Sequence, residues 1–288
     1  MDTLTLTKGV PDFREGQVSF DEDGHLERGE TPTVMNPNDR FALQAALQTK
    51  VRHGGRTSVM SMGPPGYKEV LGEAMESVYA DDLYLLSDRE MAAADTWATS
   101  ITLGTAIEKL GLPDLIFAGF KTADGETGHT GLQTCWCLDI PIVTHVVALD
   151  IEPEKGRVRA KRLVEGDVEE IETVEAPMPA MVVADPEFEP SYRTAGERLA
   201  LKDLRAKTSE RAEKYEEYLT VWDHEALNLD PDYIGLDGSP TIVESVDPIP
   251  KAPAERDATM VDPGDPDGLE DVLEEMEPFR AELAAGGD

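Results

Sequence analysis

The sequence predicts an α/β fold: a doubly wound, mainly parallel sheet of the Rossmann-like kind, with a β-hairpin edge and an extended C-terminal arm. Two observations predict it. Apolar runs of roughly 4–6 residues alternate with helical segments of roughly 12–16 residues up to residue 184, as in parallel sheets covered on both faces. A Gly-rich turn, residues 119–131, also stands between a buried strand and a helix. Ligands of such sheets bind where the carboxyl ends of the strands meet.

The parallel strands are expected at six apolar or alternating segments, residues 3–7, 57–62, 83–86, 115–118, 142–149 and 179–184. Helical periodicity predicts helices after residue 36, over 67–79, over 95–110 and, following the Gly-rich turn, up to residue 138. Asn36 is a suitable cap for the first helix, with Pro37 at its first position and Asp39 in its first turn. Asp95 is a suitable cap for the third.

Other segments are more polar and lack the apolar runs of the predicted parallel strands. Residues 11–32 are rich in Asp, Glu and Gly and predict an exposed excursion. Two polar, alternating segments, 158–164 and 168–174, predict a β-hairpin that turns at residues 165–167. The highly charged segment 202–219 predicts a helix that reaches out to another surface, because it has little apolar periodicity.

We therefore expect three parts. They are an α/β domain over residues 1–184, an arm over 185–235, and a tail over 236–288. The tail is acidic and rich in Pro and Gly, which predicts disorder apart from one short helix near residues 269–276.

The composition narrows the class of partner. The chain has 288 residues, is 40% hydrophobic and carries a formal charge of −33. Such a negative field excludes nucleic acid and anionic membrane surfaces as expected partners. Because the acids are spread along the whole chain, the pattern favours a halophilic protein, with a basic partner as the alternative.

The sequence also predicts a cytoplasmic protein without direct membrane insertion. No apolar run approaches the roughly 20 residues that a bilayer requires, and the N-terminus has no signal-peptide pattern. Cys135 and Cys137 have neither CxxC nor zinc-knuckle spacing, so we interpret them as packing residues.

The turn at residues 119–131 is the strongest candidate site. It contains four glycines and three threonines and precedes a helix. Backbone N–H groups in such a turn can converge on a phosphate, to which the helix N-terminus adds its positive end. The turn matches neither a Walker A loop nor GxGxxG, so an ordinary Gly-rich connection is the alternative.

No reaction centre is visible beside this turn. The sequence has no Gly-x-Ser-x-Gly, no HExxH and no distinctive carboxylate pair. His129 has the chemistry of a general base, but a surface histidine is the simpler interpretation. We expect no catalytic residue and no metal site, which favours a carrier over an enzyme.

Several short motifs, in order, resemble the beta subunits of electron transfer flavoproteins over about residues 1–230. They are Lys8-x-Val10-Pro11-Asp12, Asn36-Pro37-x-Asp39, Gly63-Pro64, Ser87-Asp88, Asp95-Thr96-x-Ala98-Thr99, Asp114-Leu115-Ile116, Gly119-x-x-x-x-Asp124-Gly125-x-Thr127-x-x-x-Gly131 and Glu189-Pro190-x-Tyr192. The stretch Asp95-Thr96-Trp97-Ala98-Thr99 looks like the nitrogen-fixation-type and bifurcating branch.

The resemblance implies an adenine-nucleotide-binding domain that pairs with a larger alpha subunit. The alpha subunit holds most of one FAD, which the beta subunit helps to enclose while its arm wraps the partner. The beta subunit also binds AMP or, in bifurcating members, a second FAD. Carried over by position, the contacts to this nucleotide are Leu6, Asn36, Pro37, Asn38, Asp39, Met62, Gly119, Phe120, Lys121, Thr122, Ala123, Asp124, Gly125, Glu126, Thr127, Gly128, His129 and Thr130.

The resemblance assigns three further residues. Phe13 takes the place of an aromatic residue near the alpha-subunit flavin, and the hydroxyls of Thr96 and Thr99 would contact the pyrophosphate of a second FAD. The choice between AMP and FAD stays open, with FAD favoured.

The implied function is an electron carrier between a flavin dehydrogenase and a quinone oxidoreductase. Ala195 stands where some members use a leucine to dock acyl-CoA dehydrogenases, which puts docking to that class in doubt. The alternative is a stand-alone nucleotide-binding sensor or transferase on the same fold.

Overall fold

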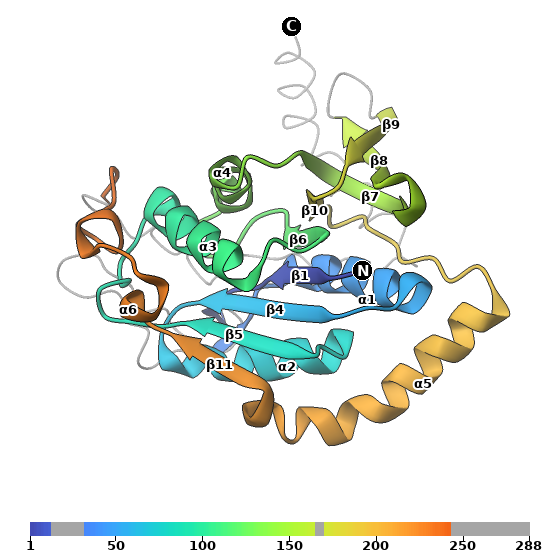
Figure 1. The fold of residues 1–288 in the computed structure, drawn as a ribbon, viewed down its shortest axis with the longest axis horizontal. Helices are drawn as coiled ribbons and strands as arrows, with labels where there is room; N and C mark the ends of the chain where they lie inside the picture. Colours follow the sequence, from blue (N-terminus) through green and yellow to red (C-terminus); the bar gives the residue numbers. More distant parts are fainter. Residues whose placement is uncertain (13–31, 165–169, 243–288) are drawn as a thin grey trace, which may run out of the picture. The chain divides into compact units, whose positions relative to one another are not determined.

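A computed structural model describes residues 1–12, 32–164 and 170–242 (Figure 1). It contains a nine-stranded sheet in the order β11-β5-β4-β1-β6-β10-β7-β8-β9. The strands from β11 to β7 pair in parallel, and β8 and β9 add in antiparallel fashion. This confirms the mainly parallel α/β fold.

Six of the parallel strands lie at the positions that the apolar runs predict. They are β1 (Thr3–Leu6), β4 (Thr57–Met62), β5 (Asp82–Leu86), β6 (Leu115–Gly119), β7 (Ile142–Glu152) and β10 (Ala180–Ala184). Nearly all residues of β1, β4, β6 and β10 are buried, because helices cover both faces of this part of the sheet.

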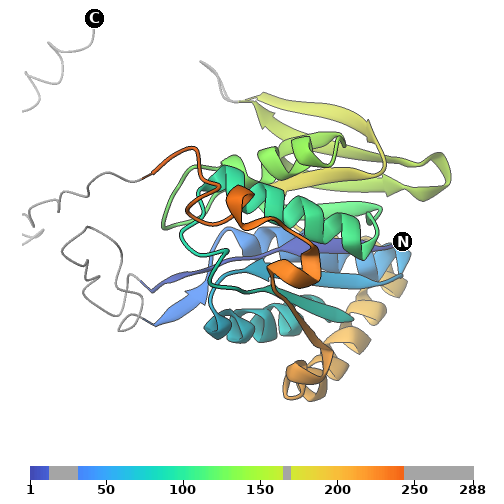
Figure 2. The same cartoon turned by 60° about the vertical axis from the view of Figure 1, so that its left-hand side comes forward.

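Helices α1 (Asp39–His53) and α2 (Lys68–Val78) cover one face, while α3 (Thr96–Leu110) and α4 (His129–Cys137) cover the other (Figures 1 and 2). Each face has its own core. Leu43, Leu71 and Phe117 belong to the first, and Leu4 and Ile107 belong to the second. The sheet is therefore wound on both sides, as the alternation of elements predicts.

The winding direction reverses beside β1. The chain proceeds from β1 to β4 and β5 on one side, and then crosses through α3 to β6 on the other side. In open α/β sheets such a reversal opens a crevice at the carboxyl ends of the two central strands. These ends are Leu6 on β1 and Gly119 on β6, so the Gly-rich turn begins at the position where sheets of this kind bind ligands.

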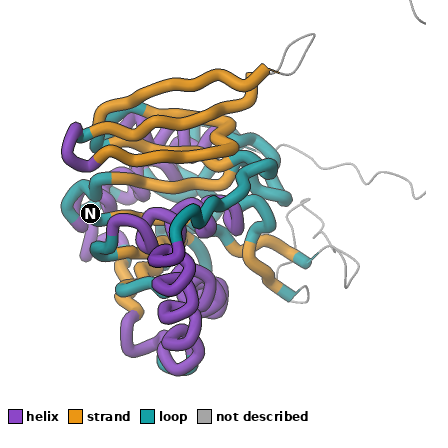
Figure 3. The backbone as a smooth tube through the Cα atoms, turned by 90° about the vertical axis from the view of Figure 1, so that its right-hand side faces the viewer, coloured by secondary structure: helices purple, strands orange, loops and turns teal. Residues whose placement is uncertain are grey.

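The hairpin prediction is confirmed. β8 (Arg157–Val164) and β9 (Glu170–Pro177) pair in antiparallel fashion at one end of the sheet (Figure 3). The connection that was expected to turn at residues 165–167 lies outside the described residues.

The helix of the charged arm was expected to reach out to another surface, but in the structure it packs on the α/β domain. α5 (Ala195–Ala212) packs against α1 and α2, with Leu201 and Leu204 on the core of that face. The chain then returns as β11 (Leu219–Trp222), an edge strand parallel to β5, and α6 (His224–Leu227) packs beside α3. Two spaced leucines contribute to the docking of α5, although the helix as a whole is polar.

The segment 11–32 was expected to be exposed, but its first residues are buried. β2 (Gly9–Pro11) pairs with β3 (Thr33–Met35), and Pro11 and Asp12 are buried rather than exposed. Residues 13–31 and the acidic tail, with the helix expected near 269–276, lie outside the described residues. The domain boundaries at residues 184 and 235 stay predictions.

Candidate functional site

The turn between β6 and α4 is held in place by Asn36, which is fully buried. The Asn36 side-chain amide donates to the Lys121 carbonyl at 3.0 Å and to Asp39 Oδ1 at 2.8 Å. Its oxygen accepts a hydrogen bond from the Ala123 N–H at 3.2 Å. Asn36 does not cap α1, because its side chain is used by the turn; the residue before the helix is Asn38, which makes no side-chain cap bond.

Asp39 and Gly119 bring α1 and β6 into close approach. A Cβ atom on Gly119 would lie 2.5 Å from Asp39 Oδ1 and 2.8 Å from the Asn38 carbonyl carbon. Asp39 Oδ2 accepts a hydrogen bond of 2.7 Å from the Lys8 N–H. Burial raises the pKa of Asp39 to about 7, against the lowering effects of the Asn36 amide and of Lys8. Only glycine fits at position 119 in this arrangement.

Lys8 connects the end of β1 to the turn. Its ammonium lies 2.6 Å from Asp124 Oδ2, and the Asp124 side chain is only 12% exposed. Burial alone would raise the pKa of Asp124, but the Lys8 charge and the hydrogen bonds to the carboxylate hold the pKa below its usual value. Next to Lys8, the buried hydroxyl of Thr7 has no hydrogen-bond partner among the described residues.

The N-terminus of α4 differs from that of α3. Gly128 precedes α4 in a left-handed conformation (φ of 65°), and the first turn of the helix holds no acid. Among the described residues, the Thr127 hydroxyl accepts a long bond of 3.4 Å from the His129 N–H. By contrast, α3 is capped by Asp95, whose Oδ1 accepts from the Trp97 and Ala98 N–H groups. The first N–H groups of α4 are thus suited to accept an anion.

The first turn of α3 lies beside the start of α4. Ser100 Oγ is 3.1 Å from the Thr130 carbonyl, and the rings of Trp97 and Trp136 are 5.6 Å apart. The part-buried Thr96 and Thr99 therefore belong to the same region as the turn. Farther along α4, the Cys135 thiol donates to the Ile140 carbonyl, and burial raises its pKa to about 11, as befits a packing residue.

The structure places most of the expected site residues at the carboxyl edge of the sheet. Leu6 ends β1, Met62 ends β4, and residues 36–39 and 119–130 meet through the Asn36 bonds. Phe13 lies outside the described residues. Lys8 was not among the expected contacts, although the motif Lys8-x-Val10-Pro11-Asp12 contains it.

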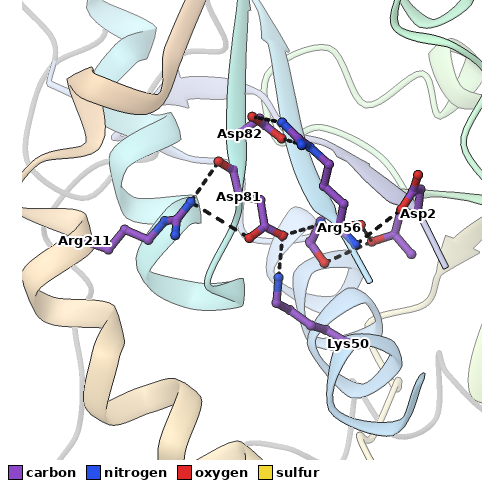
Figure 4. A network of polar contacts seen from close by, with 8 residues as sticks. Asp2, Lys50, Arg56, Asp81, Asp82 and Arg211 are labelled. Carbon is purple, nitrogen blue, oxygen red and sulfur yellow. Dashed lines mark hydrogen bonds and ion pairs between the residues drawn. The ribbon is translucent and has the colours of Figure 1, made fainter. Parts of the chain in front are cut away.

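A second polar group lies at the opposite, amino edge of the sheet (Figure 4). Asp81 accepts from the Lys50 ammonium at 2.6 Å and from the Thr57 N–H at 2.8 Å, while Arg211 of α5 donates to the Asp81 carbonyl at 2.9 Å. A hollow of about 520 Å³ lies there, but Arg56 on its wall is already paired with Asp82. These residues attach α5 to the sheet.

Within residues 1–12, 32–164 and 170–242, no helix is long and apolar enough to cross a bilayer. The same residues contain no group of three or more His, Cys, Asp and Glu side chains arranged to hold a metal ion.

Comparison with known proteins identifies the family of the chain. The family model described as "Electron transfer flavoprotein domain" matches residues 23–215. The subunit CarD of the caffeyl-CoA reductase-Etf complex of Acetobacterium woodii is 36% identical over 84% of this chain and 86% of its own length. The gamma electron transfer subunit of acryloyl-CoA reductase from Anaerotignum propionicum is 34% identical over 96% of this chain and 98% of its own. FixA of Azotobacter vinelandii is 35% identical over 85% and 83%.

The chain therefore belongs to the electron transfer flavoprotein family, as a subunit of the beta type. It is an electron-transfer subunit, which favours a carrier over the stand-alone sensor or transferase. Membership also implies a partner subunit of the same family.

Proposed function

We propose that this chain binds an adenine nucleotide of its own at residues 119–130 and helps to enclose the FAD of an alpha subunit. One observation carries the proposal: the N-terminus of α4, which has no acidic residue in its first turn, follows β6 at the point where the strand order reverses, behind a turn held by Asn36. The buried Thr7 hydroxyl, which has no hydrogen-bond partner among the described residues, also suits a phosphate or its ribose.

We further propose that the nucleotide is a second FAD, with AMP as the alternative. FAD carries a pyrophosphate and needs more contacts than AMP. The hydroxyl residues Thr96 and Thr99 begin a helix that adjoins the turn through Ser100 and Thr130, which supports an extended site.

The expected contacts divide into two roles in this proposal. Asn36 and Asp39 are buried and bonded to the protein itself, so they position the turn. The exposed and half-buried residues of the turn contact the nucleotide, namely Thr122, Ala123, Gly125, Glu126, Thr127, Gly128, His129 and Thr130.

A bound flavin supplies one- and two-electron transfer, and the protein supplies orientation, charge and protection from water. The chain would act between a flavin dehydrogenase as donor and a quinone oxidoreductase as acceptor, and flavin-based bifurcation is the form that a second FAD would support. The relatives named after caffeyl-CoA and acryloyl-CoA reductase complexes support an acyl-CoA-linked partner. Ala195 argues against the leucine-mediated mode of docking.

Co-purification of the full chain with its candidate alpha subunit tests the proposal. We expect a stable heterodimer with the visible absorbance of a flavin, which bleaches on reduction. A heterodimer without flavin absorbance, or a chain that does not associate with the alpha subunit, would contradict it.

A further inference from the structure

In a chain of net charge −33, Lys8 places a positive charge at the predicted ligand-binding edge of the sheet. It follows β1 by two residues, at the reversal of strand order, and its side chain is 35% exposed. Its backbone is fixed on both sides, since the Lys8 N–H donates to Asp39 Oδ2 at 2.7 Å and its carbonyl accepts from the Asn36 N–H at 2.9 Å. Only the flexible four-carbon stem is free to move the ammonium.

The side chains around the turn are mostly acidic, so an anion bound there requires a nearby cation. Asp39, Asp124 and Glu126 all belong to the site region. Lys121, the cation within the turn, is 36% exposed, about as much as Lys8, but it pairs at 3.2 Å with Glu126, whose side chain is 64% exposed. Lys8 instead pairs with the part-buried Asp124, where screening by water is weaker.

We infer that Lys8 is the cation that neutralises the nucleotide's phosphate, and that Asp124 is its counterion when no phosphate is bound. The inference rests on the proposed function, because it assumes that a nucleotide occupies the turn. A phosphate at the start of α4 would replace the Asp124 carboxylate as the partner of the ammonium. The carboxylate would keep the Gly125 N–H, which already donates to Asp124 Oδ1 at 2.8 Å.

A purely structural role predicts different results. If the Lys8–Asp124 pair only fixes the turn, neutralising either residue loosens the same turn and weakens every ligand alike. If Lys8 binds phosphate, its loss weakens only the binding of ligands that carry a phosphate. The loss of Asp124 then removes a carboxylate that competes with the phosphate for the Lys8 ammonium.

The experiment measures binding of AMP and adenosine to the full chain after removal of bound nucleotide, by titration calorimetry. FAD and riboflavin form a second matched pair. We expect Lys8→Gln to weaken AMP and FAD binding by at least about tenfold, as for the loss of one charge-assisted bond, and to leave adenosine and riboflavin binding unchanged. Asp124→Asn should bind AMP and FAD at least as tightly as the wild type. Lys121→Gln removes a cation of similar exposure whose partner is the exposed Glu126, and it should have a smaller effect than Lys8→Gln.

The inference is overturned if Lys8→Gln binds AMP and FAD like the wild type, or if it weakens phosphate-bearing and phosphate-free ligands equally. It is also overturned if Asp124→Asn or Lys121→Gln loses as much affinity as Lys8→Gln. Failure of the wild type to bind any of the four ligands would instead remove the proposed function itself. Circular dichroism of each variant shows that the fold is intact.

Discussion

The Asn36 amide donates a 3.0 Å hydrogen bond to the Lys121 carbonyl, across 85 positions of sequence. This bond joins the segment before α1 to the turn after β6. Because Asn36 is fully buried and also bonds Asp39 and Ala123, it fixes the position of the turn relative to the start of α1.

Asn36→Ala should therefore destabilise both the fold and the site. It leaves Asp39 Oδ1 and the Ala123 N–H without their Asn36 partner, which costs about 1–3 kcal/mol of unfolding free energy, while the Lys121 carbonyl keeps its bond from Asn38. Denaturant unfolding measures this. Asn38→Ala is the matched control: Asn38 donates to the same Lys121 carbonyl at 2.8 Å, but that carbonyl keeps its bond to Asn36. Equal losses in the two variants would contradict the assigned role of Asn36.

Gly119→Ala should disturb the contact between β6 and α1. The new methyl group would meet Asp39 Oδ1 at 2.5 Å and backbone of Asn38 at 2.8 Å, and overpacking of this kind costs about 1–3 kcal/mol. Gly125→Ala is the control, since its Cβ would meet only Thr122 Oγ1, at 3.9 Å. Thermal unfolding of the two variants checks the difference. A Gly119→Ala protein as stable as Gly125→Ala would show that the approach is looser than described.

The buried Asp39 should make stability depend on pH. Its pKa is about 7 in the folded chain and 3.8 as a model value, so the folded state holds a proton that the unfolded state releases between these values. The unfolding free energy contributed by this group is fully present below about pH 4 and is lost as pH rises through about 7, by at most about 4 kcal/mol.

Asp39→Asn removes this titration. Unfolding of wild type and variant should be compared between about pH 5 and pH 8. Wild-type stability should fall relative to the variant as pH rises, whatever the absolute offset between them. Parallel pH profiles would mean that the Asp39 carboxyl is already ionised near pH 5.

The sequence predicts the framework better than the connections within the site. Apolar runs locate β1, β4, β5, β6, β7 and β10, because burial of both faces requires such runs. Asp95 was predicted as a cap and is one, since capping depends on residues two and three positions away. Asn36 was predicted as a cap and is not, because its partners Lys121 and Ala123 lie far along the chain.

Short edge elements were missed for a related reason. β11 has four residues, two of them exposed, so its pattern is too weak to detect without β5 beside it. The docking of α5 depends on Leu201, Leu204 and Arg211, which stand out only when α2 and Asp81 are in place. Lys8 is part of a motif, but its role becomes visible only through its distance to Asp124.

Arg211→Ala should release the end of α5 from the sheet. The Arg211 guanidinium donates to the Asp81 carbonyl at 2.9 Å and stacks 4.0 Å from the centre of the Tyr218 ring (Figure 4 shows the Asp81 contact). We expect a loss of about 1–2 kcal/mol in stability and faster proteolysis near residues 205–218. Lys202→Ala, an exposed position on the same helix, should change neither. Unchanged cleavage in Arg211→Ala would mean that the leucines alone hold α5.

The nucleotides released from the denatured heterodimer test the central claim most directly. After purification with the alpha subunit, chromatography of the supernatant identifies and counts them. We predict two FAD per heterodimer, and Gly119→Ala should retain only one of them. One FAD with one AMP would keep the site and change its ligand. One FAD and no other adenine nucleotide would contradict the claim that residues 119–130 hold a nucleotide.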